Sequence, residues 1–157
     1  MHQNPPDTEL KTLLMNARTI AVVGASNNPE RPVHSVMRRL QQVGYHVIPV
    51  NPRETEILGE KSFNSLLDLP GPVDIVNVFR APEALPGIAE EAVTIGAGSL
   101  WCQFGVIHPD GARIAEAGGV AVVMDRCIKV EHARYVGRMH WLGFNTHRIT
   151  SVRGGLQ

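Results

Sequence analysis

The sequence has little cysteine, no net charge and no long hydrophobic run. Its two cysteines, Cys102 and Cys127, do not make a disulfide framework, which indicates a reducing compartment. The formal net charge is zero at pH 7, so no global attraction to nucleic acid or to an anionic membrane is expected. No apolar run approaches the roughly 20 residues that cross a bilayer, and the first residues lack the layout of a signal peptide. We therefore expect a cytoplasmic protein that binds neither nucleic acid nor membrane.

The charge is unevenly distributed along the chain, however. From Arg126 onward there are six Lys or Arg against one acid, Glu131, which is a net charge of +5 (6 − 1). The residues up to Asp125 carry nine basic and fourteen acidic side chains, a net charge of −5 (9 − 14). A basic tail can meet phosphates, but a solvated helix face followed by a loose terminus produces the same pattern.

The length of 157 residues corresponds to one domain with a single sizeable core. We expect one domain over residues 1–157, with its core at about 8–135 and a basic C-terminal extension at 136–157. The extension contains Trp141 and Phe144 among other apolar residues. Such residues can cover the edge of a sheet, or they can dock a partner protein or a second copy of the chain. The sequence leaves the oligomeric state open.

Five apolar runs are too short for helices and rich in β-branched residues, which is typical of strands buried on both faces of a parallel sheet. These runs are residues 19–23, 46–50, 73–79, 99–104 and 120–125. Helical patterns lie around and between them, often ending in glycine. The predicted helices cover residues 5–17 (with Asp7 as the cap), 33–44, the later part of 81–98, 109–119 and a short turn at 65–68.

Alternation of strands and helices with short connections predicts an α/β fold. We expect a single Rossmann-like, doubly wound domain with a five-stranded parallel sheet and helices on both faces. Right-handed crossovers make 3-2-1-4-5 the expected strand order.

The loop after the first predicted strand lacks the three spaced glycines of a dinucleotide fingerprint. It reads "GASNNPERP", and only Gly24 stands where such a glycine is needed. The small residues Gly24, Ala25 and Ser26 allow backbone N–H groups to approach an anion, and the helix that begins near Val33 adds its positive end. The alternative is that Gly24 only permits a tight turn. With a strand before and a helix after the loop, the pattern favours a phosphate site, and Arg31 lies on the loop itself.

The second predicted strand also lacks the acid that holds the ribose hydroxyls of NAD. It ends in "VNPR", so Arg53 stands near the expected place of that carboxylate. A guanidinium attracts a terminal phosphate, whose charge is about −1.5 to −2. The pattern therefore disfavours NAD and leaves NADP, with its 2′-phosphate, and coenzyme A (CoA), with its 3′-phosphate.

Several separate motifs then match one family in order: "VVGAS…P.RP…V…L…GY.VIPVNP", "VDIVNVFR", "LWCQFGV" and "VVMDRCIKVEH". Over about residues 8–135 the chain resembles the small stand-alone CoA-binding proteins. Their fold is similar to the N-terminal CoA-binding domain of the succinyl-CoA synthetase α subunit. The resemblance implies a Rossmann-like domain whose ligand is CoA or an acyl-CoA.

The resemblance also implies where each part of the ligand lies. The first loop takes the pyrophosphate, and the loop after the second strand takes the adenosine end. Residues Trp101, Cys102 and Gln103, within the fourth predicted strand, fall where the synthetase contacts the pantetheine arm. Together with Arg31, the predicted CoA-binding residues are Gly24, Ala25, Ser26, Asn27, Asn51, Pro52, Arg53, Val78, Phe79, Arg80 and Gln103.

The sequence gives little ground for a reaction. It lacks a Ser–His–Asp order, a paired-carboxylate motif and a P-loop lysine, and its histidines and cysteines have no metal-ligand spacing. From that spacing we expect no metal site. The phosphohistidine of the synthetase lies in a second domain, so we expect no stand-alone catalysis. The leading interpretation is a carrier, sensor or partner subunit. Two alternatives stay open: an NADP-dependent reductase reduced to its nucleotide domain, and a regulatory protein modified by CoA at Cys127, whose neighbours Arg126 and Lys129 can lower a thiol pKa.

Overall fold

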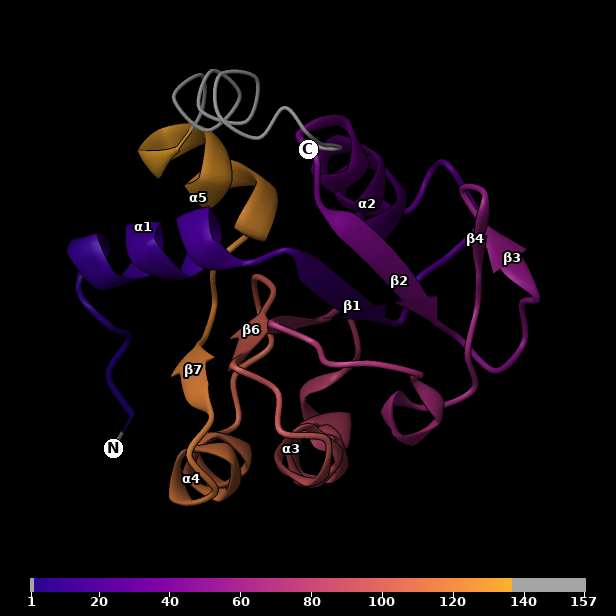
Figure 1. Cartoon of the computed structure of the whole chain (residues 1–157). Coiled ribbons are helices and arrows are strands. Elements are labelled where there is room, and N and C mark those ends of the chain that lie inside the picture. Colours follow the sequence, from indigo (N-terminus) through magenta and orange to yellow (C-terminus); the bar gives the residue numbers. More distant parts are fainter. Residues whose placement is uncertain (1, 137–157) are drawn as a thin grey trace.

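A parallel five-stranded sheet lies between two layers of helices in the computed structural model, which describes residues 2–136 (Figure 1). The predicted α/β class and the doubly wound, Rossmann-like arrangement are confirmed. The strands of this sheet are β1 (Thr19–Val23), β2 (His46–Val50), β5 (Ile75–Val78), β6 (Ser99–Cys102) and β7 (Ala121–Val123). The first two match the expected ranges, and the other three are shorter than expected.

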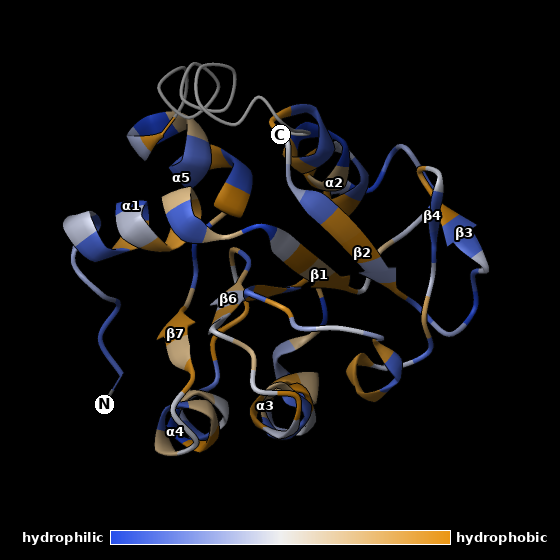
Figure 2. Ribbon diagram, viewed as in Figure 1, coloured by the Kyte–Doolittle hydropathy of each residue, from blue (hydrophilic) through white to orange (hydrophobic). Residues whose placement is uncertain are grey.

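The sheet separates two hydrophobic cores. Figure 2 shows that its strands are largely hydrophobic. One face is covered by α1 (Asp7–Asn16), α2 (Pro32–Gln42) and α5 (Ile128–Tyr135). The other face is covered by α3 (Leu85–Thr94), α4 (Pro109–Ala117) and the 3-10 turn η1 (Leu66–Asp68). Alternate residues of each strand enter opposite cores, which is why the strands are apolar almost throughout.

The observed strand order is β2-β1-β5-β6-β7, so the expected order 3-2-1-4-5 is wrong. When the five strands of the sheet are numbered 1 to 5 along the chain, this order is 2-1-3-4-5. Strand β2 therefore lies at the edge of the sheet. Pro49 within β2 supplies the physical reason, because a proline has no N–H for a central ladder and is confined to edge strands. On the outer side of β2, Phe63 forms an isolated bridge: its N–H donates to the Pro49 carbonyl (3.1 Å) and its carbonyl accepts from Asn51 N–H (2.9 Å).

Helix boundaries follow the prolines. Pro6 is extended (φ −67°, ψ 163°) and precedes α1, so Asp7 is the first helical residue and not the cap that we expected. Pro32 and Pro86 lie in the first turns of α2 and α3, where the missing N–H would have no intrahelical partner. The 3-10 turn η2 (Pro82–Ala84) leads into α3.

Two features were not among the elements predicted by residue range, although a helix face was one interpretation of the basic residues from Arg126 onward. Residues after β2 form a small antiparallel hairpin, β3 (Glu56–Ile57) and β4 (Glu60–Lys61), and α5 follows β7. Each hairpin strand has two residues, which is too short for a recognisable period. The expected extension at 136–157 falls outside the described residues except for Val136.

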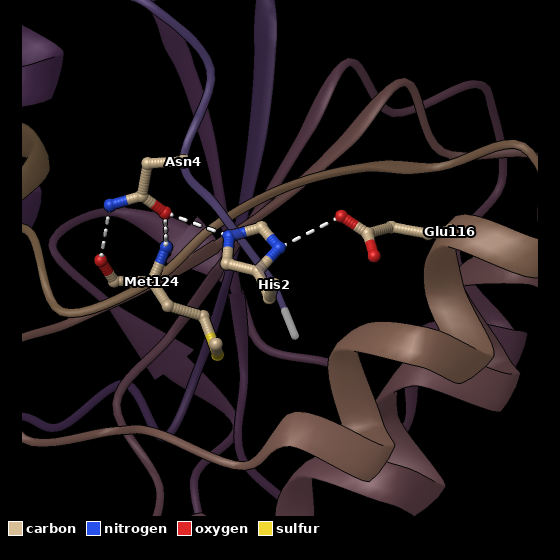
Figure 3. Close-up of polar contacts among 4 residues, drawn as sticks. All are labelled: His2, Asn4, Glu116 and Met124. Atoms are coloured by element: carbon tan, nitrogen blue, oxygen red, sulfur yellow. Dashed lines mark hydrogen bonds and ion pairs between the residues drawn. The ribbon is translucent and has the colours of Figure 1, made fainter.

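The N-terminal segment is fixed beside the edge strand β7 (Figure 3). The Asn4 amide donates to the Met124 carbonyl (2.9 Å) and accepts from the Met124 N–H (2.8 Å). His2 contacts both the Asn4 oxygen (2.9 Å) and a Glu116 carboxylate oxygen (2.8 Å). The Met124 backbone lies just beyond the end of β7, and the Asn4 side chain supplies the hydrogen bonds that a sixth strand would otherwise provide. Among residues 2–136, none of the helices has the length and hydropathy needed to cross a membrane.

Substitution on α1 tests how the first core is closed. Leu14 is fully buried and Met15, its neighbour, is 39% exposed. We expect Leu14→Ala to lower the free energy of unfolding by about 2–5 kcal/mol, because a buried Leu leaves a cavity. Met15→Ala is the matched control and should cost less than about 1 kcal/mol. Urea titrations of both variants measure this; equal losses would contradict the packing of α1 onto the sheet.

Candidate functional site

The loops that follow β1, β2 and β5 meet at the carboxyl edge of the sheet and enclose a hollow of about 560 Å³. Parallel strands bring their carboxyl ends to one edge, which is where ligands bind in open α/β sheets. The hollow is lined by Gly24, Ala25, Ser26, Arg31, Val50, Asn51, Pro52, Arg53, Glu54, Phe79, Arg80 and Ala81.

Gly24 is required by its conformation and by its contact with the next loop. Its φ is +90°, a region that residues with a side chain rarely adopt. A Cβ at this position would lie 2.4 Å from the Phe79 carbonyl oxygen. The Gly24 N–H donates to the Val50 carbonyl (3.1 Å), so this amide does not point at an anion. Gly24 therefore gives the loop its tight turn, and any anion contact of the loop falls to other amides.

The rest of the first loop holds itself in shape with local hydrogen bonds. The Ser26 hydroxyl accepts from Asn28 N–H (3.0 Å), and the Asn28 side chain accepts from Glu30 N–H (2.9 Å). Within residues 2–136, the Ser26 and Asn27 amides have no hydrogen-bond acceptor. The N-terminus of α2 also lacks a side-chain cap. Free amides and an uncapped helix N-terminus together favour an anion.

Three arginines line this hollow, namely Arg31, Arg53 and Arg80. Within the described part of the chain, none of the three forms an ion pair. The aliphatic part of Arg80 lies close to the Gly24 bend. With Glu54 as the one acid in the lining, the hollow has a net charge of +2 (3 − 1). Guanidinium groups that lack a carboxylate partner are suited to bind phosphate in pairs of hydrogen bonds.

A second hollow of about 470 Å³ continues from the first, sharing Gly24, Arg31 and Phe79. Its other lining residues are Pro32, Val33, Gln103 and Phe104. The Gln103 side-chain oxygen is buried and has no hydrogen-bond partner among residues 2–136. Because buried polar atoms are nearly always paired, Gln103 is a candidate to accept from a ligand N–H or O–H once its side chain turns toward the hollow that it lines. The two hollows together form an elongated site with a cationic end and a less charged end.

The structure brings ten of the twelve predicted residues to these hollows and leaves two outside. Val78 is fully buried in the core that contains α3 and α4, because its side chain points to that face of β5. Asn27 lines neither hollow, and its amide instead donates to the Glu54 carboxylate (2.7 Å) and to the Glu56 carbonyl (2.9 Å). The segment expected at the pantetheine arm is divided, since Trp101 and Cys102 are fully buried and only Gln103 reaches the site.

The sequence interpretation missed several lining residues, of which Glu54 and Phe104 matter most. Glu54 directly follows Arg53, so the loop after β2 does contain an acid, although not at the end of the strand. Phe104 is 57% exposed and follows Gln103 after the end of β6. The signal available in the sequence was the aromatic type of Phe104 and its place at the carboxyl end of a predicted strand.

The two cysteines lie in different environments. Burial raises the pKa of the Cys102 thiol to about 12, so this thiol is protonated and unreactive at neutral pH. Cys127 is the N-cap residue of α5 and is 6% exposed, which leaves little access for a disulfide reagent. Modification at Cys127 stays a prediction. Among residues 2–136, no group of three His, Cys, Asp or Glu side chains lies close enough together to hold a metal ion.

Comparison with known proteins places this geometry in a family. The family described as "CoA binding domain" matches residues 18–133. The uncharacterized protein YneT of Bacillus subtilis is 46% identical over 131 residues, which are 83% of this chain and 97% of that protein. A hypothetical protein from Pyrococcus horikoshii has a solved structure with a TM-score of 0.82 and 34% identity, covering 87% of this chain and 100% of that one.

A third relative is much longer. The α subunit of the ADP-forming acetate–CoA ligase II of Pyrococcus furiosus is 31% identical over 127 residues, which are 73% of this chain. The chain spans only 28% of the length of that subunit. Together with the match to most of the sheet and its loops, these similarities show that the chain belongs to the CoA binding domain family.

Proposed function

We propose that this chain binds CoA or an acyl-CoA along the two connected hollows and acts as a carrier, sensor or partner subunit. The observation that carries the proposal is the set of three arginines that line the larger hollow, none of which forms an ion pair within residues 2–136. CoA has three phosphoryl groups, two in its pyrophosphate and one on the ribose 3′ oxygen. A pocket with separate guanidinium groups is suited to separate phosphates.

The positions of the arginines suggest that they bind different phosphates of CoA. Arg31 borders both hollows, and Arg80 lies over the bend, so these two are the proposed partners of the pyrophosphate. Arg53 lines only the larger hollow, and we propose that it binds the 3′-phosphate. The Ser26 and Asn27 amides and the N-terminus of α2 add donors beside the pyrophosphate.

The second hollow is suited to the pantetheine arm. Val33, Phe79 and Phe104 offer apolar contacts, and the Gln103 oxygen has no donor in the described part of the chain. Pantetheine alternates methylene groups with two amides, so it supplies both the apolar surface and an N–H for that oxygen. NADP also carries a pyrophosphate and a terminal phosphate, but it has no flexible amide-bearing arm. This difference makes CoA the ligand that we propose and NADP the comparator.

The longer relatives support a binding role. In the P. furiosus ligase α subunit, the matching segment is a minor part of the chain. By analogy, we propose that this chain performs the CoA-binding step, either alone as a carrier or sensor, or beside a partner protein that supplies the reacting groups. The proposal includes no reaction for this chain by itself.

Arg53→Ala tests the phosphate assignment. Loss of a charge-assisted contact costs about 1.5–3 kcal/mol, so we expect CoA to bind about 10–150 times more weakly. Binding of 3′-dephospho-CoA should change less than about twofold, because the proposed partner of Arg53 is missing from it. Isothermal titration calorimetry with CoA, 3′-dephospho-CoA and NADP measures these affinities.

The matched control for that experiment is Arg38→Ala, an exposed arginine of α2 that lines neither hollow. It should leave both affinities nearly unchanged. Equal weakening of CoA and 3′-dephospho-CoA by Arg53→Ala would contradict the 3′-phosphate assignment. Failure of the unaltered protein to bind CoA, or tighter binding of NADP than of CoA, would contradict the proposed function itself.

Gln103→Ala tests the pantetheine arm separately. A neutral hydrogen bond contributes about 0.5–1.5 kcal/mol, so CoA should bind about 2–12 times more weakly. Adenosine 3′,5′-bisphosphate lacks pantetheine and should bind the variant and the unaltered protein equally. Competition titrations with both ligands check this. If the bisphosphate is weakened as much as CoA, then Gln103 acts on the shape of the loop and not on the arm.

A further inference from the structure

A carboxylate lies in the hollow where phosphates are expected. Glu54 is the one acid among the twelve residues that line the larger hollow, beside three arginines. A negative charge near bound phosphates opposes binding unless the same group makes a favourable contact with another part of the ligand. Contacts with the phosphates therefore do not explain why a carboxylate lies in this hollow.

The structure holds Glu54 in place without neutralising it. The Asn27 amide nitrogen donates to Glu54 Oε1 (2.7 Å) and, with its second hydrogen, to the Glu56 carbonyl (2.9 Å). Asn27 thereby connects the loop after β1 to the hairpin that follows β2. Within residues 2–136, the second oxygen, Oε2, has no hydrogen-bond or ion-pair partner.

None of the arginines that share the hollow pairs with Glu54 in the described part of the chain. Their guanidinium groups and the carboxylate are separate, so the cationic and the acidic sites remain available to one ligand. A nucleotide fits this arrangement, because it combines anionic phosphates with neutral donors on its base and ribose. In dinucleotide-binding sheets, an acid after the second strand accepts from a ribose hydroxyl.

We infer that Glu54 Oε2 accepts a hydrogen bond from a neutral donor of the adenosine moiety, and so determines specificity within the proposed CoA site. The donor is the 6-amino group of adenine or the ribose 2′-hydroxyl, since the 3′ oxygen of CoA carries a phosphate. This inference rests on the proposed function. Arg53 and Glu54 are adjacent in sequence. In this proposal Arg53 binds the 3′-phosphate, and Glu54 accepts from the neutral donor beside it.

Glu54→Gln tests the inference by the sign of its effect. If Glu54 accepts from the ligand, the variant should bind CoA about 5–20 times more weakly, because a charged acceptor is lost. If Glu54 is only a negative charge near phosphates, the variant should bind CoA more tightly. Isothermal titration calorimetry at fixed ionic strength distinguishes the two outcomes.

Two CoA analogues identify the donor. The hypoxanthine analogue lacks the 6-amino group, and 2′-deoxy-CoA lacks the hydroxyl. We expect one of them to bind the unaltered protein more weakly than CoA does, and to lose no further affinity with Glu54→Gln. That unchanged affinity also shows that the variant is folded. If both analogues respond to Glu54→Gln as strongly as CoA does, the inference is overturned.

Glu30→Gln is the matched control, because Glu30 is an exposed acid of the first loop that lines neither hollow. It should change CoA affinity less than about twofold. Tighter or unchanged CoA binding by Glu54→Gln overturns the inference while leaving the proposed function intact. Absence of CoA binding by the unaltered protein overturns the proposed function instead, so the two failures are distinguishable.

Discussion

The site depends on one close approach of two backbone segments, the bend at Gly24 and the Phe79 carbonyl. The two residues follow neighbouring strands, β1 and β5, and a methyl group at Gly24 would lie 2.4 Å from the carbonyl oxygen. Because no side chain separates the loops, the surface beside them stays open as a hollow. Arg80 follows Phe79 directly, so the same contact also places a guanidinium at the bend. Glycine here supplies space and conformation, while the Ser26 and Asn27 amides have no acceptor among residues 2–136.

A second constraint connects the loops after β1 and β2. The Asn51 side chain donates to the Ala25 carbonyl (2.7 Å) and accepts from Arg53 N–H (2.8 Å), so one amide fixes both the first loop and the backbone of Arg53. Asn27 makes the reciprocal connection from the first loop to Glu54. These contacts use neutral amides for positioning, and within residues 2–136 neither Glu54 nor the three arginines of the hollow form an ion pair. Such preorganisation reduces the cost of ordering the site when a ligand binds.

The sequence predicted the elements of the fold better than their arrangement. Short apolar runs located β1 and β2 correctly, because burial on both faces leaves a plain compositional pattern. The strand order was wrong because handedness and short connections do not determine which edge a strand joins. Pro49 held that information, since it restricts β2 to an edge. The hairpin of β3 and β4 could not be predicted, because its position depends on tertiary contacts such as that of Asn27 with Glu56.

The corrected strand order explains which predicted residues reach the site. In the order β2-β1-β5-β6-β7, the chain leaves β1 toward β2 on one side and returns to β5 on the other, so the crevice opens between β1 and β5. The expected order would have opened it between the first and fourth strands, beside Trp101 and Cys102. Those two residues are instead buried in the sheet, whereas Phe79 and Arg80 border the crevice. Gln103 reaches it only because it lies one residue beyond the end of β6, where the chain leaves the sheet.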